Sequence, residues 1–221
     1  MKKGKPPTLE DIARKAGVSA MSASVVLNGA RSSTRVSPDT RARIMEAAQT
    51  LGYRPNAVAR GLSKRRMDTI GIVAVIDVDE INVYFLEVLN GLLEAVAVHG
   101  QNATIFSIKK WEQDEKRVLK FCDGRIDGAV LIAPNPSLEF AKSLPQHTPF
   151  VSIHSDNFVP RIKNIEADNE GGAYQMVKYL ISKGHRRIMH ITGSEDRIGA
   201  RERIQGYRNA LRDAGIPEDP S

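Results

Sequence analysis

The chain has 221 residues, 41% of them hydrophobic, which suffices for one large hydrophobic core or two smaller ones. Its net charge of +6 is uneven: residues 1–66 hold 14 Lys or Arg against 4 Asp or Glu, and the remainder holds 18 against 22. A basic N-terminal part is typical of a module that binds a polyanion. A membrane surface would require Trp or Phe opposite the charges, and this part contains neither, so nucleic acid is favoured.

Cysteine usage and the N-terminus indicate where the protein works. A single cysteine, Cys122, excludes an intramolecular disulfide framework and fits a reducing compartment. It ends an apolar helical pattern, which favours a small buried hydrophobe over a nucleophile. Two prolines follow the basic residues at the start, so no signal peptide is visible, and no apolar run is long enough to span a bilayer. We therefore expect a cytoplasmic, nucleoid-associated protein without a membrane partner.

Residues 8–28 predict two short helices joined by a tight turn. Thr8 and Asp11 have capping-box spacing, Gly17 can end the first helix, and Ser19 can cap a second helix that ends at Asn28-Gly29. Apolar residues recur at helical spacing in both segments: Leu9, Ile12, Ala13 and Ala16, then Ala23, Val26 and Leu27. This pattern fits a helix-turn-helix or an ordinary helical hairpin. The positive charge favours the helix-turn-helix.

A third helix and a basic connecting segment follow. Ser37 and Pro38 can begin the helix, Gly52 can end it, and Ile44, Ala47, Ala48 and Leu51 would face the first two helices. Residues 1–53 would thus form a small all-α head. Within residues 54–66, a basic helical pattern at 56–62 is too short to be stable alone in water. This segment is therefore either a plain linker or a hinge.

From Thr69 onward, predicted strands and helices alternate, which is typical of a doubly wound α/β fold with a parallel sheet. Strands are expected at 70–76, 103–108, 128–133, 150–153 and 188–192. Helices are expected at 82–99, 114–122, 137–144, 169–183 and 200–214. The residues of the first of these helices that should face the core are Phe85, Leu89, Leu92, Leu93 and Val96. Residues 67–160 would form a first lobe, and 161–221 would begin a second, incomplete lobe.

Four motifs, in this order, resemble the DNA-binding head of the LacI family of transcriptional regulators. They are A-x-x-A-G-V-S at 13–19, V-L-N-G at 26–29, V-S-P-x-T-R at 36–41 and L-G-Y-R-P-N-x-x-A-R-x-L at 51–62. The resemblance implies a helix-turn-helix head, a hinge and a periplasmic-binding-protein-like effector domain. Because family members continue through a complete second lobe, the chain resembles a member truncated within that lobe.

The resemblance and the geometry of such heads assign the DNA contacts. Base reading falls to the start of the second helix, which enters the major groove first, at Ala20, Met21, Ser22, Ser24 and Val25. Family members commonly carry Arg at the position of Val25; Arg can read guanine, whereas Val either contacts a thymine methyl or belongs to the core. Phosphate contacts are implied for Thr8, Ser19, Ser22, Asn28, Tyr53 and Asn56. In a paired hinge, Ala59 would allow close approach and Leu62 would act as a minor-groove wedge.

The resemblance also implies an effector site between the lobes. Asp77 would face it from the end of the first strand, and Tyr84 would stack on a sugar, whereas Phe85 is expected in the core. Arg201, within A-R-x-R-x-x-G-Y at 200–207, matches an Arg that grips ligand hydroxyls or carboxylates. His154 stands where sugar-binding members often have Asp, which departs from a plain sugar site.

Catalysis is not indicated. The sequence lacks a phosphate-binding G-x-x-x-x-G-K-[ST], a G-x-S-x-G elbow, H-E-x-x-H and paired cysteines, and its five histidines are scattered without metal-ligand spacing. A Rossmann dehydrogenase would need a Gly-rich turn after the first strand, where the chain has Asp-Val-Asp-Glu at 77–80. We therefore expect no metal, no cofactor and no enzymatic activity.

The sequence as a whole predicts a homodimeric, sequence-specific transcriptional regulator, expected to be a repressor. It would bind a near-palindromic double-stranded DNA operator and respond to a small molecule, a sugar or related metabolite. A cytoplasmic or exported solute-binding protein is the alternative from another class, and the basic head and lack of an export signal argue against it. A third possibility is a truncated regulator that binds DNA without responding to an effector.

Overall fold

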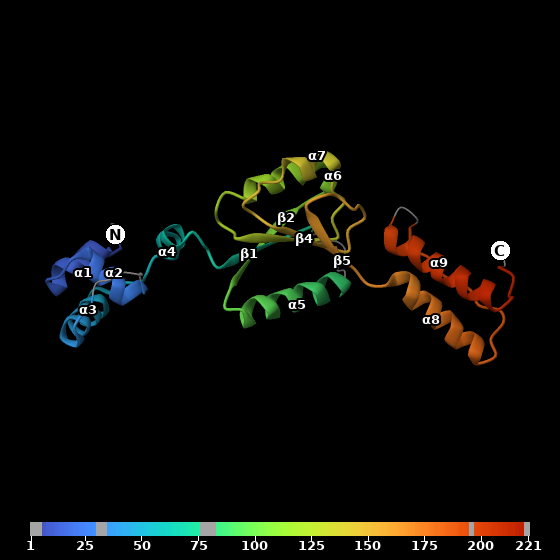
Figure 1. Ribbon diagram of the computed structural model, residues 1–221, viewed down its shortest axis with the longest axis horizontal. Helices are drawn as coiled ribbons and strands as arrows, with labels where there is room; N and C mark the ends of the chain where they lie inside the picture. The colour runs from blue at the N-terminus through green and yellow to red at the C-terminus, as the bar shows by residue number, and fades with distance from the viewer. Residues whose placement is uncertain (1–5, 30–34, 76–82, 195–196, 219–221) are drawn as a thin grey trace, which may run out of the picture. The chain divides into compact units, whose positions relative to one another are not determined.

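The computed structural model describes residues 6–29, 35–75, 83–194 and 197–218 (Figure 1). Two compact units make up the chain, Met1–Met67 and Asp68–Ser221. Asp77, expected at the effector site, lies outside the described residues.

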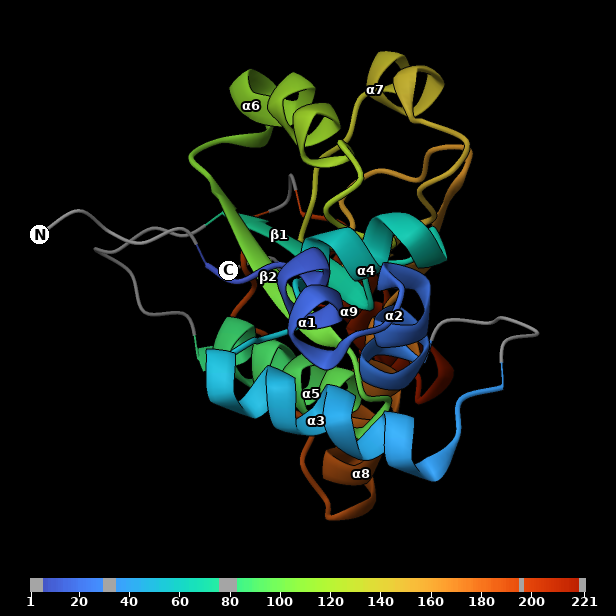
Figure 2. The same cartoon turned by 90° about the vertical axis from the view of Figure 1, so that its left-hand side faces the viewer.

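The first unit contains the expected three-helix head, with α1 (Leu9–Ala16), α2 (Ala20–Asn28) and α3 (Pro38–Leu51) packed together (Figure 2). The predicted caps are confirmed: Thr8 and Asp11 form a capping box, and Ser19 and Ser37 accept hydrogen bonds from Ser22 N and Thr40 N. These local signals explain why the helices begin where the sequence indicates. The core consists of small or branched side chains: Ile12, Ala13, Ala16, Ala23, Ile44, Ala47 and Ala48.

The segment after the head forms α4 (Ala57–Lys64), close to the helical pattern expected at 56–62. Asn56 Oδ1 begins it by accepting hydrogen bonds from the N–H groups of Val58 and Ala59. Its other end is closed by hydrogen bonds from Arg65 N to Leu62 O and from Arg66 N to Gly61 O. Gly61 is buried, and a Cβ atom there would overlap the Met67 sulfur and lie 3.2 Å from Arg66 O, so the Met67 side chain would have to move.

The second unit is built on a five-stranded, all-parallel sheet in the order β2-β1-β3-β4-β5. The strands are β1 (Thr69–Val75), β2 (Asn102–Ile108), β3 (Gly128–Ile132), β4 (Phe150–Ile153) and β5 (Ile162–Ile165). One face carries α5 (Val83–Val98), and the other carries α6 (Trp111–Val118), a 3-10 turn (Leu119–Phe121) and α7 (Leu138–Ser143) (Figure 1). The predicted α/β class is confirmed.

The two faces of the sheet bury different amounts of apolar surface. The face under α6 and α7 carries the larger cluster, which includes Val73, Phe106, Trp111, Leu131, Phe140 and Phe150. On the other face, α5 packs Phe85, Val88, Leu89 and Leu92 against Ile72, Ala74 and Ile132. The prediction that Leu93 faces inward is wrong, because it is 38% exposed and lies about 100° around the helix from Leu92. The apolar stripe of α5 is wider than the surface that the sheet covers.

One strand was not predicted and one predicted strand is wrong, for the same physical reason. Residues 162–165 were expected in the second lobe, but they form β5 and pair with β4, so the sheet of the first lobe extends beyond residue 160. Residues 188–192 were expected to form a strand, but they have no neighbouring strand among the described residues. Met189 and Ile191 are 79% and 86% exposed there. Backbone pairing, which apolar sequence alone does not supply, decides both cases.

A helix pair completes the described part of the second unit. It consists of α8 (Asn169–Ser182), capped by Asp168, and α9 (Ile198–Asp213), and it buries Val177, Tyr207, Ala210 and Leu211. The helices approach closely at Gly206, where a Cβ atom would overlap the carbonyl group of Glu170. The predicted helices 169–183 and 200–214 are confirmed in type and nearly in extent.

The only tryptophan of the chain, Trp111, is 3% exposed in the second unit and therefore reports on that unit alone. We expect Leu131→Ala, which opens a cavity at a side chain with 0% exposure, to lower the free energy of unfolding by about 2–5 kcal/mol. Denaturant unfolding followed by Trp111 fluorescence measures the change. Ile44→Ala, an equally buried change in the head, should leave the Trp111 transition in place. An equal shift for both variants would mean that the two units unfold as one.

Candidate nucleic-acid interface and ligand site

The start of α2 presents uncharged side chains to solvent. Ala20 is exposed and Met21 is 58% exposed, whereas Ser22, Ser24 and Val25 are partly buried. Between them, Ala23 is fully buried and anchors α2 to the head core. The predicted base-reading residues thus occupy an accessible helix start, and Val25 has only part of its surface available.

Exposed cationic side chains occur on every helix of the first unit except α2 and on the segments between them. They are Arg14, Lys15, Arg35, Arg41, Arg43, Arg54, Arg60, Lys64, Arg65 and Arg66. An ion pair of this unit, between Arg14 and Asp11 at 3.5 Å, involves largely exposed groups and contributes little to stability. These cations can therefore interact with a polyanion at small structural cost.

The side chains expected to contact phosphates form hydrogen bonds or packing contacts within the first unit. The Thr8 hydroxyl donates to Asp11 Oδ2 at 2.7 Å, the Ser19 and Ser22 hydroxyls lie 3.0 Å apart, and Asn56 caps α4. Asn28 Nδ2 donates to Ser24 Oγ at 3.4 Å, and its Oδ1 is buried without a hydrogen-bond partner in the described part of the chain. Tyr53 packs partly against the head core. Thr8, Ser19 and Asn56 are N-caps, so backbone N–H groups of a helix start lie near them, which favours anions, whereas Asn28 and Tyr53 lie at the C-terminal ends of α2 and α3.

The hinge helix α4 has an open apolar face. Val58 and Leu62 are 66% and 80% exposed, and their spacing of four residues places them on one side of the helix. Ala59, the expected close-approach residue, is exposed as well.

Two of the predicted effector residues come together in the second unit. The rings of Tyr84, on α5, and His154, after β4, have centroids 5.6 Å apart. His154 has a φ of 59° and meets the first turn of α9, because a Cβ atom on buried Gly199 would lie 3.0 Å from its Nε2. The same point lies 3.2 Å from Arg203 Nη1 and Asn169 Nδ2. This group of residues lies beyond the carboxyl ends of the strands, where open α/β sheets bind ligands.

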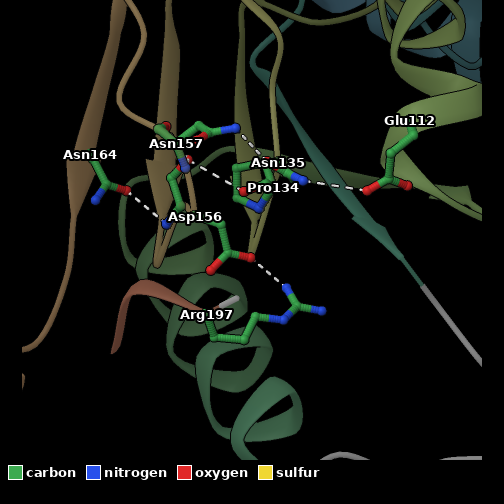
Figure 3. A network of polar contacts seen from close by, with 8 residues as sticks. Glu112, Pro134, Asn135, Asp156, Asn157, Asn164 and Arg197 are labelled. Atoms are coloured by element: carbon green, nitrogen blue, oxygen red, sulfur yellow. Dashed lines mark hydrogen bonds and ion pairs between the residues drawn. The ribbon is translucent and has the colours of Figure 1, made fainter. Parts of the chain in front are cut away.

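A polar network next to His154 fixes the loops that follow β3 and β4 (Figure 3). Asp156, whose side chain is 12% exposed, pairs with Arg197 at the start of α9, and its N–H donates to Pro134 O at 3.0 Å. Asn157 Nδ2 donates to Asn135 Oδ1, and Asn164 Oδ1 accepts from Ser155 N at 3.1 Å. The network ties the β4 loop to both its neighbours in the sheet and α9.

Sequence reasoning did not find Asp156, Arg197, Asn169 or Arg203. The available signal for Asp156 was its position three residues after a predicted strand. Its partner Arg197 is 41 residues away in the sequence, so the pair leaves no local signal. Arg201 lies on α9 and is exposed. Phe85 packs on the sheet, so its expected core role is confirmed.

Other features of the second unit do not resemble a ligand site. A cavity of about 630 Å³ lies between residues 186–192 and α9, and its lining includes Tyr207 and Leu211 from the core of the helix pair. It lies against the unpaired segment 188–192 and does not include His154 or Tyr84.

Burial raises the pKa of the Cys122 thiol, which further disfavours a thiolate nucleophile.

Within residues 6–29, 35–75, 83–194 and 197–218, no group of three or more His, Cys, Asp or Glu side chains could hold a metal ion. None of the described helices is both long and apolar enough to cross a bilayer.

Comparison with known proteins assigns both units. Residues 8–56 match the family described as bacterial regulatory proteins, lacI family, and residues 69–220 match periplasmic binding proteins and sugar binding domain of LacI family. A helix-turn-helix head with a periplasmic-binding-protein-like body defines a two-part class of protein. The chain belongs to the LacI family of bacterial regulatory proteins.

The relatives show how much of a family member is present. Catabolite control protein A of Priestia megaterium is 32% identical over 95% of this chain and 62% of its own length. The solved complex of the transcriptional regulator CelR with cellobiose is 31% identical, with a TM-score of 0.58 over 96% of this chain and 63% of that one. The lac repressor dimer bound to operator and the anti-inducer ONPF has a TM-score of 0.77 at 24% identity, covering 96% and 64%, which shows the fold alone. The chain thus spans less than two thirds of the length of these proteins.

Proposed function

We propose that this chain is a sequence-specific DNA-binding transcriptional regulator, acting as a repressor whose DNA binding is controlled by a small-molecule effector. The observation that carries the proposal is the exposed start of α2 on a compact head whose other helices bear exposed cations. Such a helix can enter the major groove while Lys and Arg neutralise phosphates on either side. The proposed site of action is the cytoplasm, at the nucleoid, and the proposed role is not enzymatic.

The proposed division of the chain follows the expected one with a single change. Residues 1–53 form the head and 54–66 the hinge. We keep the expected start of the first lobe at 67 and, because β5 pairs with β4, propose that the second lobe begins after residue 165 rather than at 161. The base-reading and phosphate-contacting residues are those that the resemblance assigns in the head.

The open apolar face of α4 supports a dimeric hinge. Val58 and Leu62 are exposed in the single chain, and pairing of two α4 helices in a widened minor groove would cover this face. Leu62 would then press on the central base step, where unstacking costs a few kcal/mol that bending-dependent contacts offset. Two heads held this way would bind the half-sites of a near-palindromic operator.

The group of residues around His154 supports an effector site shared by the two lobes. Tyr84 offers an aromatic face, and the ring of His154 can form hydrogen bonds. Arg201 and Asp77 are the other two residues expected to bind the effector. The CelR relative is a complex with cellobiose, which favours a sugar or related metabolite here. Because Asp156 and Arg197 join the β4 loop to α9, a ligand at this place would alter how the lobes meet, which couples it to the hinge.

The full chain should bind random-sequence duplex DNA with a steep dependence on salt, because exposed cations release condensed counterions. Gel shifts at two salt concentrations measure this dependence. If the chain makes 6–10 phosphate contacts, raising the salt concentration from roughly 50 to 200 mM should weaken binding about 10³- to 10⁵-fold. Absence of any shift at the lower concentration would contradict the proposal and favour a solute-binding protein.

Leu62→Ala should weaken binding to a selected operator by about 2 kcal/mol per hinge, since three carbon atoms of the wedge are lost, and should leave non-specific binding nearly intact. Titration of the selected and a scrambled duplex measures both affinities. Val98→Ala, at a side chain that is 77% exposed on α5, is the matched control and should change neither. An equal loss on both duplexes would eliminate the wedge.

A sugar that occupies the proposed site should raise the thermal stability of the second unit, by about 2.7 kcal/mol at 100 times its dissociation constant. Unfolding followed by Trp111 fluorescence, with a panel that includes cellobiose, measures the effect. Tyr84→Ala should abolish the shift, whereas Tyr179→Ala, at an exposed tyrosine on α8, should keep it. If no sugar shifts the transition, or if Tyr84→Ala leaves a shift unchanged, this effector site is wrong.

A further inference from the structure

The proposed recognition helix contains no ionisable side chain. The sequence of α2 is AMSASVVLN, with no Lys, Arg, His, Asp, Glu or Gln. In the major groove, guanine is read by Arg or Lys and adenine by Asn or Gln, through pairs of hydrogen bonds. Only Asn28, at the C-terminal end of α2, belongs to these types. The end of α2 that enters the groove therefore lacks the usual readers of purines.

The polar side chains of α2 already have hydrogen-bond partners within the head. Ser19 Oγ accepts from Ser22 N at 3.1 Å, and the hydroxyls of these two serines lie 3.0 Å apart. Ser24 Oγ accepts from Asn28 Nδ2, and Asn28 Oδ1 is buried. Ser19 Oγ and Ser24 Oγ each use an acceptor site in these contacts, and Asn28 lies at the C-terminal end of the helix, away from the end that enters the groove. The polar side chains of α2 are thus partly engaged within the head.

The groups that α2 offers to a partner are apolar. Met21, which is 58% exposed, and Val25, which is partly buried, are four residues apart and share one face, and exposed Ala20 lies beside Met21. The thioether side chain of Met21 is flexible and polarisable, so it adapts to small apolar surfaces. Among the four bases, only thymine presents such a surface in the major groove, its C5-methyl group.

We infer that α2 reads thymine methyl groups, with Met21 as the principal specificity-determining residue and Ala20 and Val25 extending the apolar contact. The operator half-site then carries A·T or T·A pairs, with the methyl turned toward α2, at the positions that face Met21. This inference rests on the proposed DNA-binding function. The exposed cations of the other helices hold the phosphates and supply affinity, and the methyl contacts supply the sequence preference.

The test removes the methyl groups from the DNA and leaves every Watson–Crick pair in place. The full chain first selects duplexes from a random pool, and the selected half-site is then made with deoxyuridine in place of single thymidines. Loss of one contacted methyl should weaken binding about fourfold. Conversely, 5-methylcytosine opposite guanine at such a position should bind better than cytosine.

A matched pair of variants assigns the effect to Met21. Met21→Ala should bind the thymidine and deoxyuridine duplexes equally well, whereas Met45→Ala, at a methionine that is 54% exposed on α3, should still distinguish them. Sequence-specific binding that is insensitive to deoxyuridine at every position, or equal behaviour of the two variants, would overturn the inference and leave the proposed function standing. Absence of any selected sequence would overturn both.

Discussion

The structure depends on the requirement that every backbone N–H removed from water finds an acceptor. In the first unit, side chains meet it at the helix starts: Thr8, Ser19, Ser37 and Asn56 each accept hydrogen bonds from the first turn of a helix. In the body, neighbouring strands meet it, so a segment becomes a strand only where a partner lies beside it. The same parallel pairing brings the carboxyl ends of β3 and β4 to one edge, where the loop carrying His154 and Asp156 begins.

This requirement also explains what the sequence could and could not predict. Capping residues, glycines and helical spacing are signals within a short stretch of sequence. They predict the three head helices and α8 and the residues at which these helices begin. Strand pairing is not local, so β5 was missed and residues 188–192 were expected as a strand. Near the carboxyl ends of the strands, the family resemblance led us to expect Tyr84 and His154 at one site, and their rings lie close together, whereas the Asp156–Arg197 pair joins residues from separate elements and was not expected. Side-chain partners at that separation leave no periodic signal.

Charge and shape are divided between different helices of the head. The exposed cations lie on α1, α3, α4 and their connections, whereas α2 is uncharged along its whole length. Electrostatic attraction acts at long range and does not distinguish bases, whereas apolar contact acts at short range and does. In the function proposed above, such a head would hold any duplex loosely and one sequence more tightly. Replacing the few side chains at the start of α2 would alter the preference without disturbing the charges.

The hydrogen bonds at the two ends of α4 have a consequence for pairing. Asn56 accepts from Val58 N and Ala59 N at the start, and Arg65 N and Arg66 N donate to Leu62 O and Gly61 O at the end, so both ends find partners within a single chain. Ordering a residue costs about 1–2 kcal/mol in conformational entropy, and these contacts offset part of that cost for a helix that is too short to be stable alone in water. Two such chains would meet with less of this segment left to order.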